Sequence, residues 1–390
     1  MKDNIVSCFK SYLHCFHYIP LLVLMVVPCI VYFNSFDVPF VFDDLSNISD
    51  NQKVHLYNLD LENIKKATFS GLSSNRWLPN LSIALNYYYG ATDTWGYHLV
   101  NLVIHVLVGL VVYFLFFLTL TMPVVSFSSI RAREISLFAA LIWSLHPLQT
   151  NAVTYIVQRM TSMAALFFLL SLLFYVLARL QRGHFLKRFS LFFASFLLGI
   201  MALVSKENAY MLPLIIVAYE LYFFSDSRES INLKKTLLIG CPAILTVFAL
   251  SWMFLGKNPF LLFDSILKGY ELRDFNLTER LLTESRIFFY YIGLIILPLP
   301  SRLNLLHDYT LSKSLTAPPQ TLIALLGIGL FLFIIYYFFR RNRLLSFALF
   351  WFFANLLIES TIVPLRLIFE HRLYLPSVML ILLAIVSLYK

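Results

Sequence analysis

The chain has 390 residues, of which 59% are hydrophobic and only 13% are charged. A water-soluble domain of this size could not bury so much apolar surface, so the composition excludes a soluble globular protein and makes the lipid bilayer the solvent. The formal net charge of +9 comes from Lys and Arg residues in short segments beside apolar runs, a pattern that reports membrane topology and offers no continuous basic face for nucleic acid.

Apolar runs long enough to cross a bilayer recur from end to end of the sequence, since a span needs about 20 residues. We expect an all-α polytopic membrane protein of about ten transmembrane helices, forming a single domain over residues 1–390. The first run has no small-x-small cleavage site and is expected to stay as a helix. The expected spans are 19–33, 97–121, 135–157, 161–180, 189–204, 209–224, 236–255, 320–339, 345–358 and 373–390.

Basic residues occupy every second junction between these runs, which by the positive-inside rule places those junctions and the N-terminus in the cytoplasm. Two long loops, 34–96 and 256–319, then face outward. The first loop is predicted to carry short interfacial helices at 60–69 and 81–89. The apolar stretch 287–300 is too short to span comfortably and is predicted to be a re-entrant or interfacial segment.

An acidic pair, Asp43 and Asp44, lies a few residues after the first apolar run ends. Like charges beside apolar residues raise at least one carboxyl pKa, which suits a general base. Paired carboxylates could also hold Mg²⁺ or Mn²⁺, whereas the four cysteines have neither metal-ligand nor redox spacing. The alternative for the pair is an N-cap of a short helix.

Further polar clusters interrupt the apolar runs at their predicted outer ends. Pro147 is expected to break or kink its helix beside His146, for which a plain kink is the alternative. Lys206 and Glu207 lie in a very short turn between two runs, for which an ordinary salt-bridged turn is the alternative. The other residues of this kind are Arg159, Glu279, Glu284, Arg286, Asn304, His307, Asp308, Glu359, Glu370, His371 and Arg372.

All of these clusters fall on the outer side under the expected topology, which predicts one outward-facing polar site. By contrast, Asn101 and His105 lie one helical turn apart within a span and are expected to make hydrogen bonds between helices.

Several stretches, taken in order, resemble the membrane portion of the transmembrane-and-TPR O-mannosyltransferases and their bacterial relatives, which are glycosyltransferases of the GT-C type. The ordered set is more specific than any one stretch. The stretches are Phe42–Asp44, Arg76–Leu78, Tyr97–His105, Leu145–Val153 with Arg159, Ser205–Asn208, Leu303–Tyr309 and Glu370–Ser377.

The resemblance implies a GT-C-like fold, a sugar donor carried on a polyprenyl phosphate, and an acceptor hydroxyl on a protein or a glycan. It implies transfer on the non-cytoplasmic side, at the periplasmic face of a bacterial inner membrane or in the lumen of the endoplasmic reticulum. The acidic residue of the first outer loop acts as base in such enzymes, which corresponds to Asp43, with Asp44 as its neighbour or substitute. The resemblance argues against a need for metal.

The remaining polar residues have expected roles in a single displacement with inversion. Fixed cations would stabilise the departing phosphate, histidines would donate hydrogen bonds, and Glu207 and Glu370 would orient the cations, while Asp308 would bind sugar or acceptor. The cations are Arg159, Lys206 and Arg372, and the histidines are His146, His307 and His371.

Two alternatives compete with this interpretation, one from another class of protein and one within the same enzyme class. A transporter would place its ionisable groups near mid-membrane and often shows inverted repeats, and neither feature is visible in the sequence. An oligosaccharyltransferase or a glycan or lipid ligase would share the fold, and no TPR repeat occurs in these residues to favour a protein acceptor.

Overall fold

The computed structural model describes residues 18–69, 75–181, 183–225 and 266–389, and the expected span at 236–255 lies outside them. All regular structure in the described residues is helical. Contacts divide the chain into two units, described separately below. Unit 1 comprises Met1–Leu212 with Ile385–Lys390, and unit 2 comprises Pro213–Ala384.

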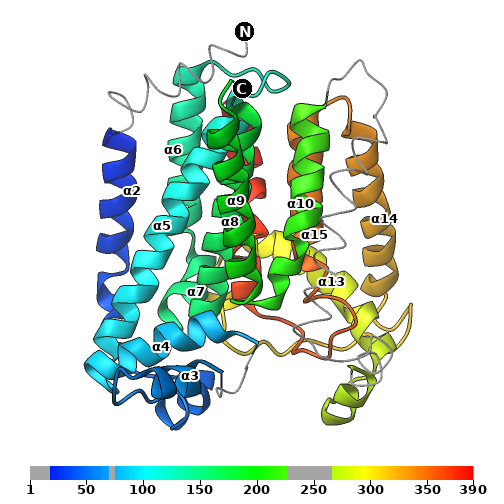
Figure 1. Cartoon of the computed structure of the whole chain (residues 1–390). Helices are drawn as coiled ribbons and strands as arrows, with labels where there is room; N and C mark the ends of the chain where they lie inside the picture. The colour runs from blue at the N-terminus through cyan, green and yellow to red at the C-terminus, as the bar shows by residue number, and fades with distance from the viewer. Residues whose placement is uncertain (1–17, 70–74, 182, 226–265, 390) are drawn as a thin grey trace. The chain divides into compact units, whose positions relative to one another are not determined.

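The body of unit 1 is a set of long apolar helices around α5 (Figure 1). Helix α5 packs against α2, α6 and α8, and α8 packs along α9. Serine hydroxyls tighten the last contact, because Ser171 and Ser195 each donate to the carbonyl of the other, at 2.7 and 2.8 Å. These helices are α2 (Tyr18–Val31), α5 (Thr94–Thr121), α6 (Ser129–Leu145), α8 (Arg159–Leu180) and α9 (Phe185–Leu203).

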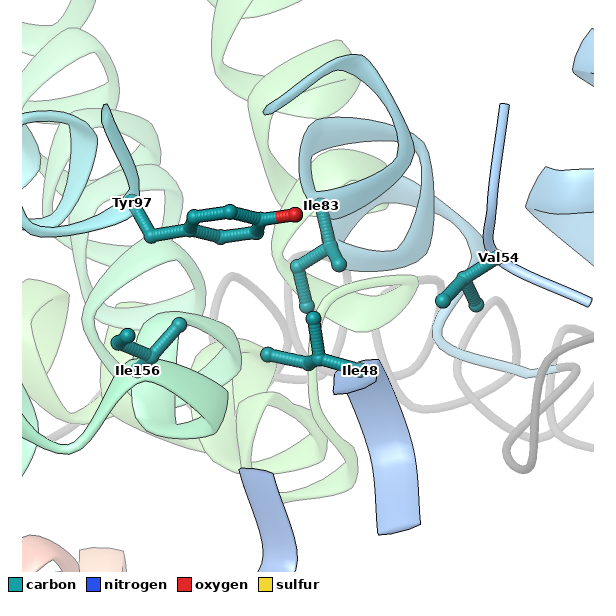
Figure 2. Close-up of a cluster of buried hydrophobic side chains, with 5 residues drawn as sticks. All are labelled: Ile48, Val54, Ile83, Tyr97 and Ile156. Atoms are coloured by element: carbon teal, nitrogen blue, oxygen red, sulfur yellow. The ribbon is translucent and has the colours of Figure 1, made fainter. Parts of the chain in front are cut away.

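Both short helices expected in the first outer loop are present, as α3 (Leu61–Phe69) and α4 (Trp77–Gly90). Helix α4 contacts both α5 and α8, and it lies across one end of these helices in Figure 1. Five buried side chains join the loop to the helices, as Figure 2 shows: Ile48, Val54, Ile83, Tyr97 and Ile156. Burying each one fully stabilises the fold by about 1.5–3 kcal/mol, so the loop is anchored on its helices.

Pro147 ends α6, which confirms the predicted break. A proline lacks the N–H that continues a helix, and α6 stops at Leu145. The chain then takes a 3₁₀ turn at Pro147–Gln149, a short helix α7 (Thr150–Thr154) and a second 3₁₀ turn at Ile156–Gln158 before α8 begins. The span expected at 135–157 is therefore an earlier helix followed by a broken connection.

The buried polar side chains of α5 make the interhelical hydrogen bonds expected of them. Asn101 Nδ2 donates to the carbonyls of Val153 and Ile156, at 3.2 and 3.3 Å. His105 Nε2 lies 2.9 Å from the carbonyl of Ser144. The broken connection after α6 is thus held to α5 through its own freed carbonyls.

In unit 2, α14 packs against both α13 and α15. Helix α13 starts with a capping box, in which Asn276 accepts from the N–H of Glu279 and the Glu279 carboxylate accepts from the N–H of Asn276. Residues 287–296 of the apolar stretch predicted at 287–300 are therefore the second half of a helix that begins ten residues earlier, and the last four residues follow that helix. The helices are α10 (Leu212–Tyr219, whose first residue belongs to unit 1), α13 (Leu277–Ile296), α14 (Gln320–Phe338), α15 (Arg343–Leu356) and α16 (Ser377–Leu388, whose last four residues belong to unit 1).

Four segments in the described residues are long and apolar enough to cross a bilayer. They are Thr94–Thr121, Ile156–Leu180, Phe185–Leu203 and Gln320–Phe338. Helices α2, α15 and α16 are apolar but shorter. The protein is therefore a membrane protein, and the described residues do not establish the expected count of about ten spans.

Candidate functional site

The acidic pair lies in a strained turn of unit 1. Phe42, which precedes the pair, has φ of 46°, in the left-handed region that costs a non-glycine residue on the order of 1–2 kcal/mol. The Asp44 carboxylate bridges the turn to the chain after α7. Its Oδ1 accepts from the N–H of Val157 at 2.7 Å, and its Oδ2 accepts from the N–H of Val41 at 3.2 Å. Asp44 thus holds the strained conformation in place.

The Asp44 side chain is fully buried. Burial raises the pKa of this carboxyl to about 6, against the opposing effect of the N–H groups of Val157 and Val41. Both carboxylate oxygens accept backbone hydrogen bonds, so Asp44 acts here as an anchor for the turn.

Asp43 has a different environment, although it is adjacent in sequence. The residue is exposed, and its backbone N–H donates to the Tyr155 hydroxyl at 2.9 Å. Its carbonyl accepts from Asn47 Nδ2 at 2.7 Å. The backbone of Asp43 is therefore fixed on both sides while the residue itself faces outward.

The segment Tyr155–Thr161 collects contacts from three distant parts of unit 1. Besides the turn that carries Asp43 and Asp44, it contacts Arg76, whose Nη1 lies 2.8 Å from Met160 Sδ. It also contacts Lys206, whose Nζ donates to Thr161 Oγ1 at 3.1 Å. The acidic turn, the start of α4 and the turn after α9 therefore all meet one short stretch of chain.

Glu207 pairs with Arg76, which lies in the resembling stretch Arg76–Leu78 and has no role predicted from the sequence. Arg76 Nε lies 3.1 and 3.0 Å from the two carboxylate oxygens, and Nη2 lies 2.8 Å from Oε2. The side chains are 26% and 39% exposed, so this ion pair is open to solvent. The signal that could have found Arg76 is its position directly before α4.

Arg159 is fully buried, and its guanidinium is held by three acceptors. Nε donates to Asn101 Oδ1 at 2.7 Å, and Nη2 donates to the carbonyl of Tyr97 at 3.0 Å. Nη1 donates to Ser82 Oγ at 3.0 Å. Since a guanidinium carries five N–H donors, most are committed, and the side chain ties α4 and α5 to the start of α8.

His146 caps the 3₁₀ turn that follows α6. It is 8% exposed, and its Nδ1 accepts from the N–H of Leu148 at 3.3 Å. This contact stabilises the break at Pro147. The structure thus places the six predicted site residues of unit 1 around one connection, and of these Asp43 and Glu207 are the more open to solvent.

In unit 2, His307 and Glu370 form a pair. His307 Nε2 lies 3.2 Å from Glu370 Oε1, and the same oxygen accepts from the N–H of Asn304. On the other side of the ring, the Tyr290 hydroxyl lies 3.5 Å from Nδ1 and donates to the carbonyl of Arg302 at 3.1 Å. Glu370 therefore orients a histidine rather than one of the predicted cations.

Arg372 is buried in a second ionic cluster of unit 2. Its Nη1 and Nη2 donate to the carbonyls of Leu367 and Arg366, and Nη1 lies 3.9 Å from Glu284. Arg280 lies 3.0 Å from the same glutamate and donates to three more carbonyls of the connection after α15. Burial raises the pKa of Glu284 to about 7, opposed by Arg372 and Arg280. Both arginines thus hold this connection in shape.

The last two predicted residues of unit 2 differ in exposure. The ring of His371 stacks on Phe369 with centroids 4.9 Å apart and is buried, whereas Asp308 is exposed. Throughout the described ranges, no group of three or more His, Cys, Asp or Glu side chains is arranged to hold a metal ion.

Comparison with known proteins gives a consistent set of relatives. The chain is 29% identical to human protein O-mannosyl-transferase TMTC2 over 251 residues, which cover 59% of this chain and 28% of the relative. It is 32% identical to mouse protein O-mannosyl-transferase TMTC3 over 167 residues, covering 41% of this chain and 17% of the relative. It is 31% identical to Drosophila melanogaster protein O-mannosyl-transferase Tmtc3 over 226 residues, covering 52% and 24%.

The resemblance expected from the motifs is thereby confirmed. No family model matches the chain, and no solved structure matches it. The matched region spans between 17% and 28% of the length of these curated relatives.

Proposed function

We propose that this protein is a membrane glycosyltransferase that moves a sugar from a polyprenyl-phosphate donor to an acceptor hydroxyl on the non-cytoplasmic side. The relatives are named as protein O-mannosyl-transferases, which favours mannose as the sugar and a protein Ser or Thr hydroxyl as the acceptor. The apolar helices favour a donor whose lipid tail stays in the bilayer. The N-terminus would face the cytoplasm, with the two long loops on the opposite side.

The observation that carries the proposal is the difference in environment between the two residues of the acidic pair. Asp44 is buried and accepts two backbone hydrogen bonds, whereas Asp43 is exposed on a backbone fixed by the Tyr155 hydroxyl. A general base must reach the proton that it removes and must be held in place. Asp43 meets both requirements, so we assign it as the base and Asp44 as the residue that positions it.

The proposed reaction is a single displacement with inversion. The acceptor O–H gives its proton to the Asp43 carboxylate as the oxygen attacks the anomeric carbon. The bond from that carbon to the phosphate oxygen breaks, and the polyprenyl phosphate leaves with both bonding electrons. The configuration at the anomeric carbon inverts because attack and departure occur on opposite faces.

The departing phosphate gains negative charge, so the site must supply fixed positive charge near it. In unit 1, Lys206 is held by Thr161 and remains our candidate for this role. Arg159 and Arg372 are buried and committed to carbonyl, amide and hydroxyl oxygens, so we assign them to supporting the loops. In unit 2, the side chain of His307 is oriented by Glu370.

The environment of the acidic pair also bears on whether Asp43 and Asp44 bind a divalent cation together. A cation held jointly by Asp43 and Asp44 would have to displace the N–H groups of Val157 and Val41 from Asp44. We therefore propose that Asp43 acts without a bound Mg²⁺ or Mn²⁺. Full transfer activity in the presence of a chelator would agree, and a loss restored by added Mg²⁺ or Mn²⁺ would overturn this step.

The proposal is tested by reconstituting the protein in liposomes with labelled polyprenyl-phosphate mannose and a Ser/Thr-containing peptide. We expect a covalent mannosyl-peptide whose anomeric configuration is opposite to that of the donor. Retained configuration would contradict the single displacement. Labelled sugar that crosses the membrane without forming product would instead identify a transporter, and label on added glycan or lipid but never on peptide would reassign the acceptor.

A further inference from the structure

The pair of Arg76 and Glu207 offers a role that the proposed function does not yet use. We propose that Arg76 is the guanidinium that binds the donor phosphate in unit 1, and that Glu207 occupies it until the phosphate displaces the carboxylate. This inference rests on the proposed function, because it assumes a lipid-phosphate donor.

The geometry of the pair matches that of a phosphate contact. Arg76 presents Nε and Nη2 to the Glu207 carboxylate, with separations of 2.8–3.1 Å. A phosphate presents two oxygens at a similar spacing and prefers the same two-point contact with arginine. Glu207 therefore marks a place where an anion with two oxygens already fits.

Arg76 is more exposed to solvent than Arg159, the other arginine of the site. Arg76 is 26% exposed and Glu207 is 39% exposed, whereas Arg159 is fully buried with three oxygen acceptors. A solvent-exposed ion pair contributes little to stability, so its carboxylate can be exchanged at small cost. An incoming phosphate would replace that exposed pair with charge-assisted hydrogen bonds of its own.

Arg76 and the proposed base are also attached to the same segment of unit 1. Asp43 is fixed through Tyr155, and Arg76 contacts Met160, five residues later on the same segment. At about 1.5–2 Å of rise per residue, the two attachment points lie within about 10 Å along the segment.

The isoprenoid tail of the donor also needs a path into the bilayer, and a phosphate bound at Arg76 would provide one. The segment that carries Met160 and Thr161 continues as the apolar helix Ile156–Leu180, one of the four long enough to cross a bilayer. A phosphate at the start of this segment would leave its isoprenoid chain free to follow the helix into lipid.

The test measures binding of farnesyl phosphate to the purified protein in nanodiscs, with farnesol and inorganic phosphate as separate probes. We expect Arg76→Ala to weaken farnesyl phosphate binding about 10–100-fold while leaving the weak binding of farnesol unchanged. We expect Glu207→Gln to tighten it up to about fivefold, because the competing carboxylate charge is gone while the shape is kept. Arg188→Ala, which removes an exposed arginine of α9, is the matched control and should leave binding unchanged.

Weaker binding in Glu207→Gln would overturn the inference, since it would show that Glu207 orients Arg76 instead of competing for it. Unchanged binding in Arg76→Ala would remove Arg76 from the phosphate site while leaving the proposed function intact. A wild-type protein that binds farnesol and farnesyl phosphate equally would contradict a lipid-phosphate donor and hence the proposed function itself. Glu207→Gln keeps the test decisive if Arg76→Ala does not fold.

Discussion

Replacing Asp44 by asparagine should change how the stability of the protein depends on pH. The asparagine amide would keep one oxygen that can accept from the N–H of Val157 or Val41, but it would not titrate. In the wild-type protein, burial raises the pKa of the Asp44 carboxyl from an ordinary value of 3.8 to about 6. The folded state therefore binds the Asp44 proton more tightly than the unfolded state does.

The sign and size of the effect follow from linkage. Because the pKa is higher in the folded state, the stabilising contribution is complete below about pH 4 and is lost as the pH rises through about 6. A change from 3.8 to about 6 corresponds to about 3 kcal/mol, at 1.36 kcal/mol for each pH unit. The unfolded carboxyl is already partly ionised at pH 4, so part of this contribution is lost there. The free energy of unfolding of wild type minus that of Asp44→Asn should thus fall by about 2 kcal/mol between pH 4 and pH 7.

Denaturant unfolding of both proteins in the same detergent, at several pH values from 4 to 7.5, measures this difference. All other titrating groups are shared, so their contributions cancel in the subtraction. A difference between the two proteins that stays constant over this range would refute the account of Asp44 as a buried anchor. A difference that grows with pH would show that its pKa is lowered, as for a paired or solvated carboxylate.

Two further substitutions test the structure around the acidic pair. At Phe42, where φ is 46°, Phe42→Gly should be more stable than Phe42→Ala by about 1 kcal/mol, which reverses the usual preference for alanine; equal stabilities would show that the turn is not strained. Arg159→Ala should lower the free energy of unfolding by about 3–5 kcal/mol because it leaves buried acceptors at Asn101 and Tyr97, whereas Arg188→Ala should change it by less than about 0.5 kcal/mol. Similar losses in both arginine variants would contradict the buried role of Arg159.

The helices themselves could be predicted from the sequence, because their determinants are local. Apolar runs locate α5, α9 and α14, and Pro147 locates the end of α6. The two short helices of the first outer loop were also predicted. The start of α13 is not among the predictions, although the Asn276 capping box is a local signal that begins the helix well before its apolar half.

The roles of individual site residues depended on contacts that are distant in sequence. Asp43 and Asp44 have the same chemistry, but Asp44 is buried and accepts from Val157, 113 residues away in the sequence, whereas Asp43 is exposed. Arg159 is predicted to bind phosphate from its charge, its expected outer position and its place beside a resembling stretch, but Asn101 and Tyr97 converge on it through the fold. Such convergence leaves no local signal in the sequence.

The central claim is that Asp43 removes the proton from the acceptor, and transfer kinetics of a single variant test it most directly. Asp43→Asn is compared with Asp50→Asn, a control that changes another exposed aspartate of the same loop. We expect the turnover of Asp43→Asn with polyprenyl-phosphate mannose to fall about 10²–10⁴-fold, with unchanged folding and donor binding, and Asp50→Asn to match wild type. Near-normal turnover of Asp43→Asn would contradict the account.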